Sequence, residues 1–113
     1  MVKMKLFIFL FLIFIFLIGC APKTSKYDSF ALCLFEKDAT MYGTEWCSHC
    51  KNQKSLFGSA FKHVNYVDCD IDRDECLRAG VNGYPTWIIN GKPYEGEQPL
   101  DRLSRLTGCE LPN

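Results

Sequence analysis

Apolar residues follow two different patterns along the chain. Residues 6–18 form an unbroken apolar run without a charged side chain, and two lysines precede it. A run of about 13 residues is typical of a signal peptide and is shorter than the ~20 residues that a membrane-spanning helix needs. We therefore predict that residues 1–19 are a signal peptide, or a signal anchor that is not removed. Residues 20–27 are predicted to be a polar tether and residues 28–113 one folded domain.

After the tether, apolar residues recur with the periods of helices and strands. A spacing of three and four residues is typical of an amphipathic helix, and short runs of β-branched and aromatic residues are typical of strands. Asn90-Gly91 is a strong signal for a hairpin. The order of these segments predicts an α/β fold, with a mixed sheet of about four strands flanked by helices. The predicted helices cover residues 25–37 or 28–37, 51–61, 74–79 and 99–106. The predicted strands cover residues 39–43, 65–69, 86–89 and 92–94.

Cys47 and Cys50 are separated by two residues and lie between a predicted strand and a predicted helix. A thiol at the N-terminus of a helix faces unpaired amide groups, and these favour the thiolate over the thiol. We therefore predict that Cys47 is an exposed nucleophile and that Cys50 is the buried thiol that resolves a mixed disulfide. His49 lies between them and, when protonated, would add a positive charge beside the thiolate.

Two other roles are open to a Cys-x-x-Cys pair. A zinc site would need further ligands at the spacing of a zinc finger, such as a second Cys-x-x-Cys pair, and the sequence has none. A purely structural disulfide between Cys47 and Cys50 would close a short and strained ring. The sequence therefore predicts a redox centre at this pair and no metal.

Charge and cysteine content narrow the classes of function. The chain has 13 basic and 13 acidic residues, without a basic run that would indicate nucleic-acid binding. Seven cysteines are typical of an exported protein, because disulfides persist outside the cytoplasm. The residues Leu17-Ile18-Gly19-Cys20 resemble a bacterial lipobox. We therefore predict that Cys20 is lipidated and that the domain is membrane-anchored and extracytoplasmic, in the periplasm or at the cell surface.

The six cysteines other than Cys20 allow fifteen full pairings. Cys69 and Cys76 flank a short acidic loop that a local disulfide would close, and we favour a structural bridge there over a second redox relay. If the Cys-x-x-Cys pair is the redox centre, Cys33 and Cys109 are left over. A bridge between those two would close nearly the whole domain.

Several short motifs are spread over residues 30–108, almost the whole predicted domain. They are Trp46-Cys47-Ser48-His49-Cys50-Lys51, Met41-Tyr42-Gly43, Gln53-Lys54, Leu56-Phe57-Gly58, Gly83-Tyr84-Pro85-Thr86-Trp87, Ile89-Asn90-Gly91 and Gly96-Glu97. Together they resemble the thioredoxin superfamily. More closely, the chain is similar to the thioredoxin-like domains that are fused to, or encoded with, membrane proteins of the vitamin K epoxide reductase type.

The resemblance implies roles for residues that are distant from the cysteines in the sequence. Pro85 would be the cis-proline that faces the Cys-x-x-Cys pair. The backbone of Tyr84 would pair with a bound substrate segment. Trp46 and Trp87 are candidates for the wall of this groove, although its strand position suits Trp87 equally well for the core.

Two departures from the family bear on the direction of electron flow. Reducing thioredoxins carry a buried aspartate six residues before the first cysteine as a proton relay, and this chain has Met41 there. Glu45 is close but precedes Trp46 on a loop, so we do not assign it that role. The central Ser48-His49 dipeptide is closer to the Pro-His of strongly oxidising members. Both departures favour an oxidant, because a stabilised thiolate makes the reduced form the better product.

The predicted function is therefore a membrane-tethered, extracytoplasmic thiol–disulfide oxidoreductase that forms disulfides in exported proteins. We expect a monomer without a cofactor. The resemblance implies a membrane partner of the vitamin K epoxide reductase type that accepts the electrons. One alternative is a reductase for an exported or haem-maturation substrate, and the other is a non-catalytic binding or metal-carrying module of the same fold.

Overall fold

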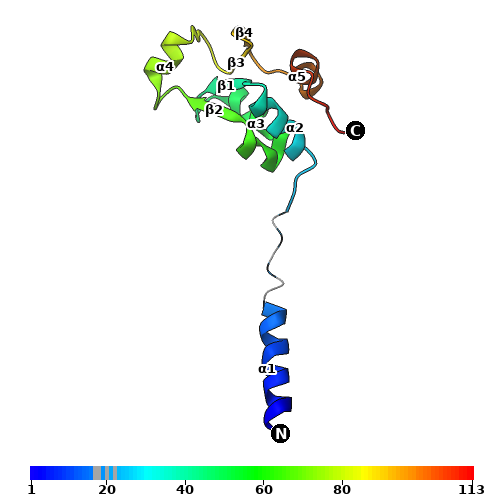
Figure 1. Ribbon diagram of the computed structural model, residues 1–113. Helices are drawn as coiled ribbons and strands as arrows, with labels where there is room; N and C mark the ends of the chain where they lie inside the picture. Colours follow the sequence, from blue (N-terminus) through cyan, green and yellow to red (C-terminus); the bar gives the residue numbers. More distant parts are fainter. Residues whose placement is uncertain (17–18, 20, 22) are drawn as a thin grey trace.

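A four-stranded sheet organises the folded part of the chain (Figure 1). The structure, a computed structural model, describes residues 1–16, 19, 21 and 23–113. The strands are β1 (Thr40–Gly43), β2 (Asn65–Asp68), β3 (Thr86–Ile89) and β4 (Lys92–Glu95). Their order in the sheet is β2-β1-β3-β4, with β1 and β2 parallel and the other two pairs antiparallel. The predicted α/β fold with a mixed sheet is thereby confirmed.

The helices agree with the predicted order but differ in their bounds. The helix predicted over residues 51–61 is wrong at both ends. It begins at Ser48, because Cys47 provides its cap, and its α-helical part ends at Phe57, because Gly58 adopts a left-handed φ of +57°. The chain then continues as a 3-10 helix. The helices are α2 (Asp28–Glu36), α3 (Ser48–Phe57), the 3-10 helix η1 (Gly58–His63), α4 (Arg73–Arg78) and α5 (Leu100–Thr107).

Aromatic side chains join α2, α3 and β3 in the main core. The ring centroid of Phe57 lies 6.1 Å from that of Phe30 and 6.1 Å from that of Trp87. All three side chains are buried. Trp87 is therefore a core residue, which is one of the two roles that the sequence analysis left open for it. Its burial matters for the site, because it packs α3 against the sheet at a fixed position.

A smaller apolar cluster covers the opposite face of the sheet. It consists of Tyr42, Val67, Cys69 and Cys76. Tyr42 follows Met41 in β1, and successive strand residues point to opposite faces, so Met41 belongs to the main core. This second cluster is where α4 is attached to the end of β2.

The structure contains two disulfides. Cys33 of α2 is bonded to Cys109 behind α5, at a separation of 76 in the sequence. Cys69 after β2 is bonded to Cys76 of α4, at a separation of 7. These are the two pairings that the sequence analysis favours. The first ties the C-terminal segment to the helix that opens the domain.

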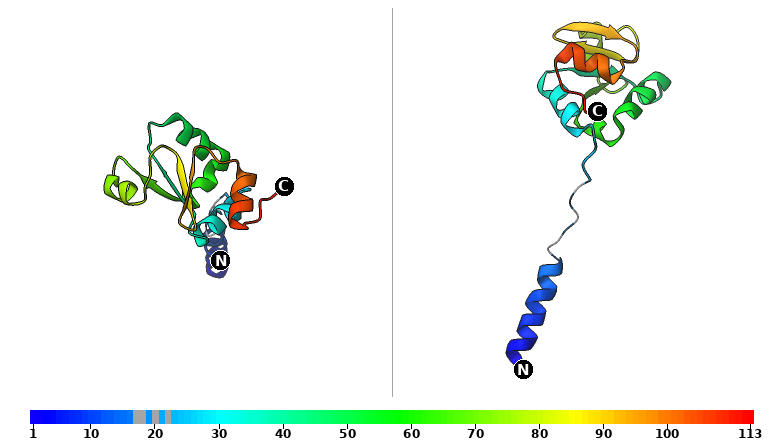
Figure 2. Two further views of the ribbon diagram at one scale, coloured as in Figure 1. Left: turned by 90° about the horizontal axis from the view of Figure 1, so that it is seen from above. Right: turned by 90° about the vertical axis from the view of Figure 1, so that its right-hand side faces the viewer.

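The N-terminal segment is a separate helix, α1 (Val2–Phe16), which lies apart from the sheet in Figure 1 and in the right-hand view of Figure 2. None of the helices in the described part of the chain is both long enough and apolar enough to cross a membrane. Three residues of the predicted lipobox, Leu17, Ile18 and Cys20, lie outside the described residues. The lipidation of Cys20 therefore stays a prediction.

Candidate active site

Cys47 is the residue that caps the N-terminus of α3. Its backbone is extended, with φ −71° and ψ 120°, and its Sγ accepts a hydrogen bond from the backbone N–H of Cys50 at 3.3 Å. This geometry directs a backbone N–H and the positive end of the helix dipole at the sulfur. Both cysteines are free, so the structure holds the reduced form of the pair.

The two cysteines differ less in their exposure to solvent than the sequence predicts. Cys47 has 8% of its surface exposed, and Cys50 has none. The prediction of an exposed Cys47 is therefore wrong. The segment before β3 covers it, since Sγ of Cys47 lies 3.6 Å from the carbonyl oxygen of Tyr84 and donates to it. Cys47 is nevertheless the member of the pair that solvent can reach.

Cys50 occupies a closed position behind Cys47. Burial raises the pKa of the Cys50 thiol to about 12, the hydrogen bond with Cys47 adds to this rise, and a backbone hydrogen bond from Thr44 opposes it. Gly43 lies directly against the sulfur, because a Cβ at this position would come within 2.7 Å of Cys50 Sγ. A side chain at residue 43 would therefore displace the buried sulfur.

Tyr84 and Pro85 lie beside Cys47 although Tyr84 is 37 residues away in the sequence. The Tyr84–Pro85 peptide bond is cis, as the family resemblance implies. Trp46 is 66% exposed at the same place, its ring meets that of Tyr84 edge to face at 6.3 Å, and its indole N–H donates to Asp70 at 2.8 Å. The fold thus brings together the residues predicted for the nucleophile and for its groove.

His49 points to a partner that the sequence analysis did not assign. Nδ1 of His49 lies 2.7 Å from Oε1 of Glu97, and Nδ2 of Asn52 donates to the same oxygen at 3.3 Å. The hydrogen bond with His49 lowers the pKa of Glu97. Glu97 thereby places a negative charge beside the imidazole of His49. In the sequence, the only sign of a role for Glu97 was the Gly96-Glu97 motif of the family resemblance.

Gln53 is a buried polar residue that links α3 to the loop before α5. Its Nε2 donates to the carbonyl oxygen of Gln98 at 2.9 Å. Its Oε1 accepts from the backbone N–H of Gln98 at 2.6 Å and from the indole N–H of Trp87 at 3.1 Å. Sequence reasoning missed this role, because a glutamine one turn behind the cysteines resembles any polar helix residue.

Replacing Gln53 with leucine should lower the free energy of unfolding by about 2–4 kcal/mol, because three buried polar groups would lose their partners. Urea denaturation measures the change. Ser55→Ala, on the exposed side of the same helix, is the matched control and should change stability by less than about 0.5 kcal/mol. An equally small loss for Gln53→Leu would contradict the linking role.

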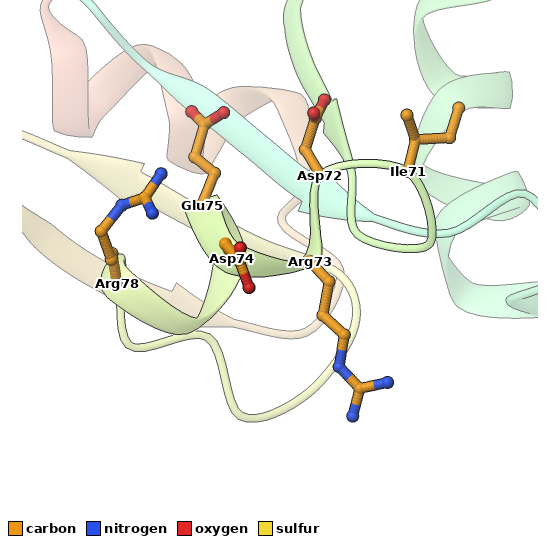
Figure 3. A pocket seen from close by; sticks show the side chains of 6 residues that line it. All are labelled: Ile71, Asp72, Arg73, Asp74, Glu75 and Arg78. Carbon is orange, nitrogen blue, oxygen red and sulfur yellow. The ribbon is translucent and has the colours of Figure 1, made fainter.

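The acidic loop after β2 forms a separate feature, seen from close by in Figure 3. Its hollow is lined by three acidic residues, Asp72, Asp74 and Glu75, and by two basic residues, Arg73 and Arg78. Across the residues that the structure describes, no group of three or more His, Cys, Asp or Glu side chains could hold a metal ion. A hollow of about 250 Å³ at this loop is lined by Ile71, Asp72, Arg73, Asp74, Glu75 and Arg78.

A comparison with protein families matches residues 35–106 to the family described as Thioredoxin. This range covers more than half of the chain and includes all four strands, Cys47, Cys50 and Pro85. The chain belongs to the thioredoxin family. The thioredoxin domain also resembles a solved structure, a mutant thioredoxin from Halobacterium salinarum NRC-1, with a TM-score of 0.50 and 21% identity. That likeness covers 69% of this chain and 82% of the other and shows the fold.

Two curated relatives are similar to this thioredoxin domain over part of their length. The thiol-disulfide oxidoreductase LTO1 of Arabidopsis thaliana is 45% identical over 82 residues, which cover 65% of this chain and 22% of the relative. The protein disulfide isomerase-like 2-2 of Oryza sativa subsp. japonica is 34% identical over 79 residues, which cover 58% of this chain and 21% of the relative. The chain therefore spans about a fifth of the length of these relatives.

Proposed function

We propose that the chain is a thiol–disulfide oxidoreductase that uses Cys47 and Cys50. The observation that carries this proposal is the difference in exposure between the two cysteines, since Cys47 keeps 8% of its surface exposed and Cys50 keeps none. Cys47 caps α3 beside the cis Tyr84–Pro85 segment, and Cys50 lies fully buried behind it. A two-step exchange needs this asymmetry, because the partner must be able to attack one sulfur only. The names of the two curated relatives support the same class of activity.

In the direction of disulfide formation, a substrate thiolate attacks Cys47 Sγ of the oxidised pair. A bond forms between the substrate sulfur and Cys47, the Cys47–Cys50 bond breaks, and Cys50 leaves as a thiolate that takes up a proton. A second substrate thiolate then attacks the substrate sulfur of this mixed disulfide, and Cys47 leaves as a thiolate. Two electrons have moved from the substrate to the pair, and the cap of α3 stabilises the final leaving group.

The surroundings of Cys47 suit a substrate that arrives as an extended segment of chain. The carbonyl oxygen of Tyr84 is 3.6 Å from the sulfur and can accept a hydrogen bond from a substrate amide once the thiol proton has left. Trp46 offers an exposed apolar face next to it. A protein substrate would therefore contact both backbone and ring, and we propose that the substrates are cysteine-containing exported proteins.

The uncharged Met41 supports oxidation rather than reduction as the physiological direction. It is fully buried in the main core, at the position where reducing members of the family carry an aspartate. Equilibration of the Cys47–Cys50 pair with glutathione buffers tests this direction. A reduction potential near about −120 mV would support disulfide formation, and one near about −270 mV would support the reductase alternative. A pair that does not exchange with glutathione would support a non-catalytic binding module instead.

We further propose that the domain works outside the cytoplasm, anchored to a membrane through Cys20 or through the apolar N-terminal segment. The apolar run at residues 6–18, the lipobox-like sequence and the two disulfides support this location, because structural disulfides persist in oxidising compartments. The partner that reoxidises Cys47 and Cys50 would then be a membrane protein of the vitamin K epoxide reductase type.

A further inference from the structure

The buried thiol of Cys50 has to ionise in an environment that disfavours a negative charge. On the proposed function, Cys50 attacks or leaves as a thiolate in every exchange, yet burial raises the pKa of this thiol to about 12. Met41, in the same core, has no charge to offer. A group that stabilises the Cys50 thiolate must therefore come from another part of the site.

The aromatic ring of Tyr66 and the sulfur of Cys50 both lie next to Gly43. Both approach the same point of β1: a Cβ on Gly43 would be 2.7 Å from Cys50 Sγ and 3.5 Å from Cε2 of Tyr66. Tyr66 reaches this point because β2 runs parallel to β1, with Tyr66 in register with Met41. The ring and the sulfur thus share one side of the sheet.

Lys54 places its ammonium over this ring. Nζ of Lys54 lies 4.0 Å from the ring centroid of Tyr66. Lys54 follows Cys50 by four residues in α3, so both side chains project from the same face of the helix. Oε1 of Glu45 accepts a hydrogen bond from Nζ at 2.8 Å and holds the ammonium in place.

The positive charge of the Lys54 ammonium acts on Cys50 more strongly than the negative charge of the Glu45 carboxylate that holds it. The Lys54 side chain is 22% exposed and that of Glu45 is 68% exposed, so water screens the negative charge more strongly than the positive one. Tyr66 stays neutral, because burial raises the pKa of its hydroxyl. The remaining titratable neighbour is Cys47, whose thiolate would oppose ionisation of Cys50. Lys54 is the cation among these four groups.

We propose that Lys54, held by Glu45 over the ring of Tyr66, is a positioning residue that stabilises the Cys50 thiolate and so sets the rate at which a mixed disulfide on Cys47 is resolved. In this step the Cys50 thiol gives its proton to solvent and its thiolate attacks Cys47 Sγ. The Cys47–Cys50 bond forms, and the bond from Cys47 to the other sulfur breaks. That sulfur leaves as a thiolate, so the pair is oxidised by two electrons and the other disulfide is reduced.

Dithionitrobenzoate separates this step from the attack by Cys47. The full-length chain, carrying Cys20→Ser in every variant, is reduced and mixed with one equivalent of the reagent in a stopped-flow instrument. Cys47 attacks first and releases one thionitrobenzoate. Cys50 then resolves the mixed disulfide and releases the second. The rate of the second phase should rise with pH, because the thiolate fraction of Cys50 rises with pH below its pKa.

Lys54→Met should slow the second phase about tenfold at a given pH and move its pH profile about one unit higher, with the first phase changed by less than about twofold. Lys54→Arg keeps the charge and should restore the second phase. Lys54→Gln, which can still hydrogen-bond Glu45, should be as slow as Lys54→Met and replaces it if the methionine variant does not fold. Lys51→Met removes an exposed positive charge from the same helix and should leave both phases within about twofold.

An unchanged second phase in Lys54→Met and Lys54→Gln would overturn the inference, as would an equal slowing in Lys51→Met. The proposed function fails in a different way. If the unmodified pair shows no first phase, or if Cys47→Ala leaves that phase intact, Cys47 is not the nucleophile, whatever the effect of Lys54.

Discussion

Cys47→Ala should abolish disulfide exchange, with insulin reduction and disulfide transfer falling to the level of buffer without protein. The sulfur of Cys47 is the one that a partner can reach, and Cys50 is fully buried behind it. No other free thiol in the described residues can take over the attack, since the remaining four cysteines there are paired. Insulin turbidity in the presence of dithiothreitol measures the loss.

The matched control for this variant is Cys50→Ala, which removes the resolving sulfur and keeps the nucleophile. It should lose turnover as well, but it should accumulate a mixed disulfide that non-reducing electrophoresis detects and Cys47→Ala does not form. Both variants should unfold at nearly the same urea concentration as the unmodified chain. Undiminished exchange in Cys47→Ala would rule out the two-step mechanism.

The double variant Cys33→Ala/Cys109→Ala should lower the free energy of unfolding by about 4–5 kcal/mol. The bridge spans 76 positions, and the chain-entropy model assigns a value of this size to so long a loop. A domain this small has a total stability of only about 5–15 kcal/mol, so much of the population should unfold at moderate urea concentrations. Urea denaturation followed by tryptophan fluorescence measures the change, with Trp87 reporting on the core.

Removal of the short bridge supplies the comparison. Cys69→Ala/Cys76→Ala opens a loop with a separation of only 7, for which the same model assigns about 2–3 kcal/mol. In this variant, the packing of the smaller apolar cluster should weaken, while the main core should stay intact. Equal losses for the two double variants would contradict an effect that depends on loop length.

Local elements were predictable wherever the chemistry of a few adjacent residues decides the backbone. Asn90 and Gly91 both take positive φ values, of 53° and 75°, and form the hairpin between β3 and β4 that their sequence indicates. Gly108 ends α5 in the left-handed conformation for the same kind of reason. The end of α3 was mispredicted, because apolar residues continue beyond Gly58. The sequence predicted a helix to residue 61 that Gly58 weakens or kinks, whereas the α-helical part ends at Phe57.

The family resemblance predicted features of the site that the pattern of apolar residues could not. It implied the cis bond before Pro85 and the approach of Tyr84 to Cys47, neither of which spacing can reveal. It did not reveal that the Tyr84 segment covers Cys47 and leaves only 8% of its surface exposed. Burial depends on how closely the segment before β3 packs on the start of α3.

The sequence by itself determined the order of helices and strands, the position of the Cys47–Cys50 pair at the start of a helix, and the cysteines available for the bridges. Each of these depends on neighbours along the chain. Only the tertiary structure decided that His49 meets Glu97 and that Lys54 lies over Tyr66. These contacts join residues 48 and 12 positions apart, and the packing of α3 against the sheet and the loop before α5 creates them, so no local pattern of residues records them.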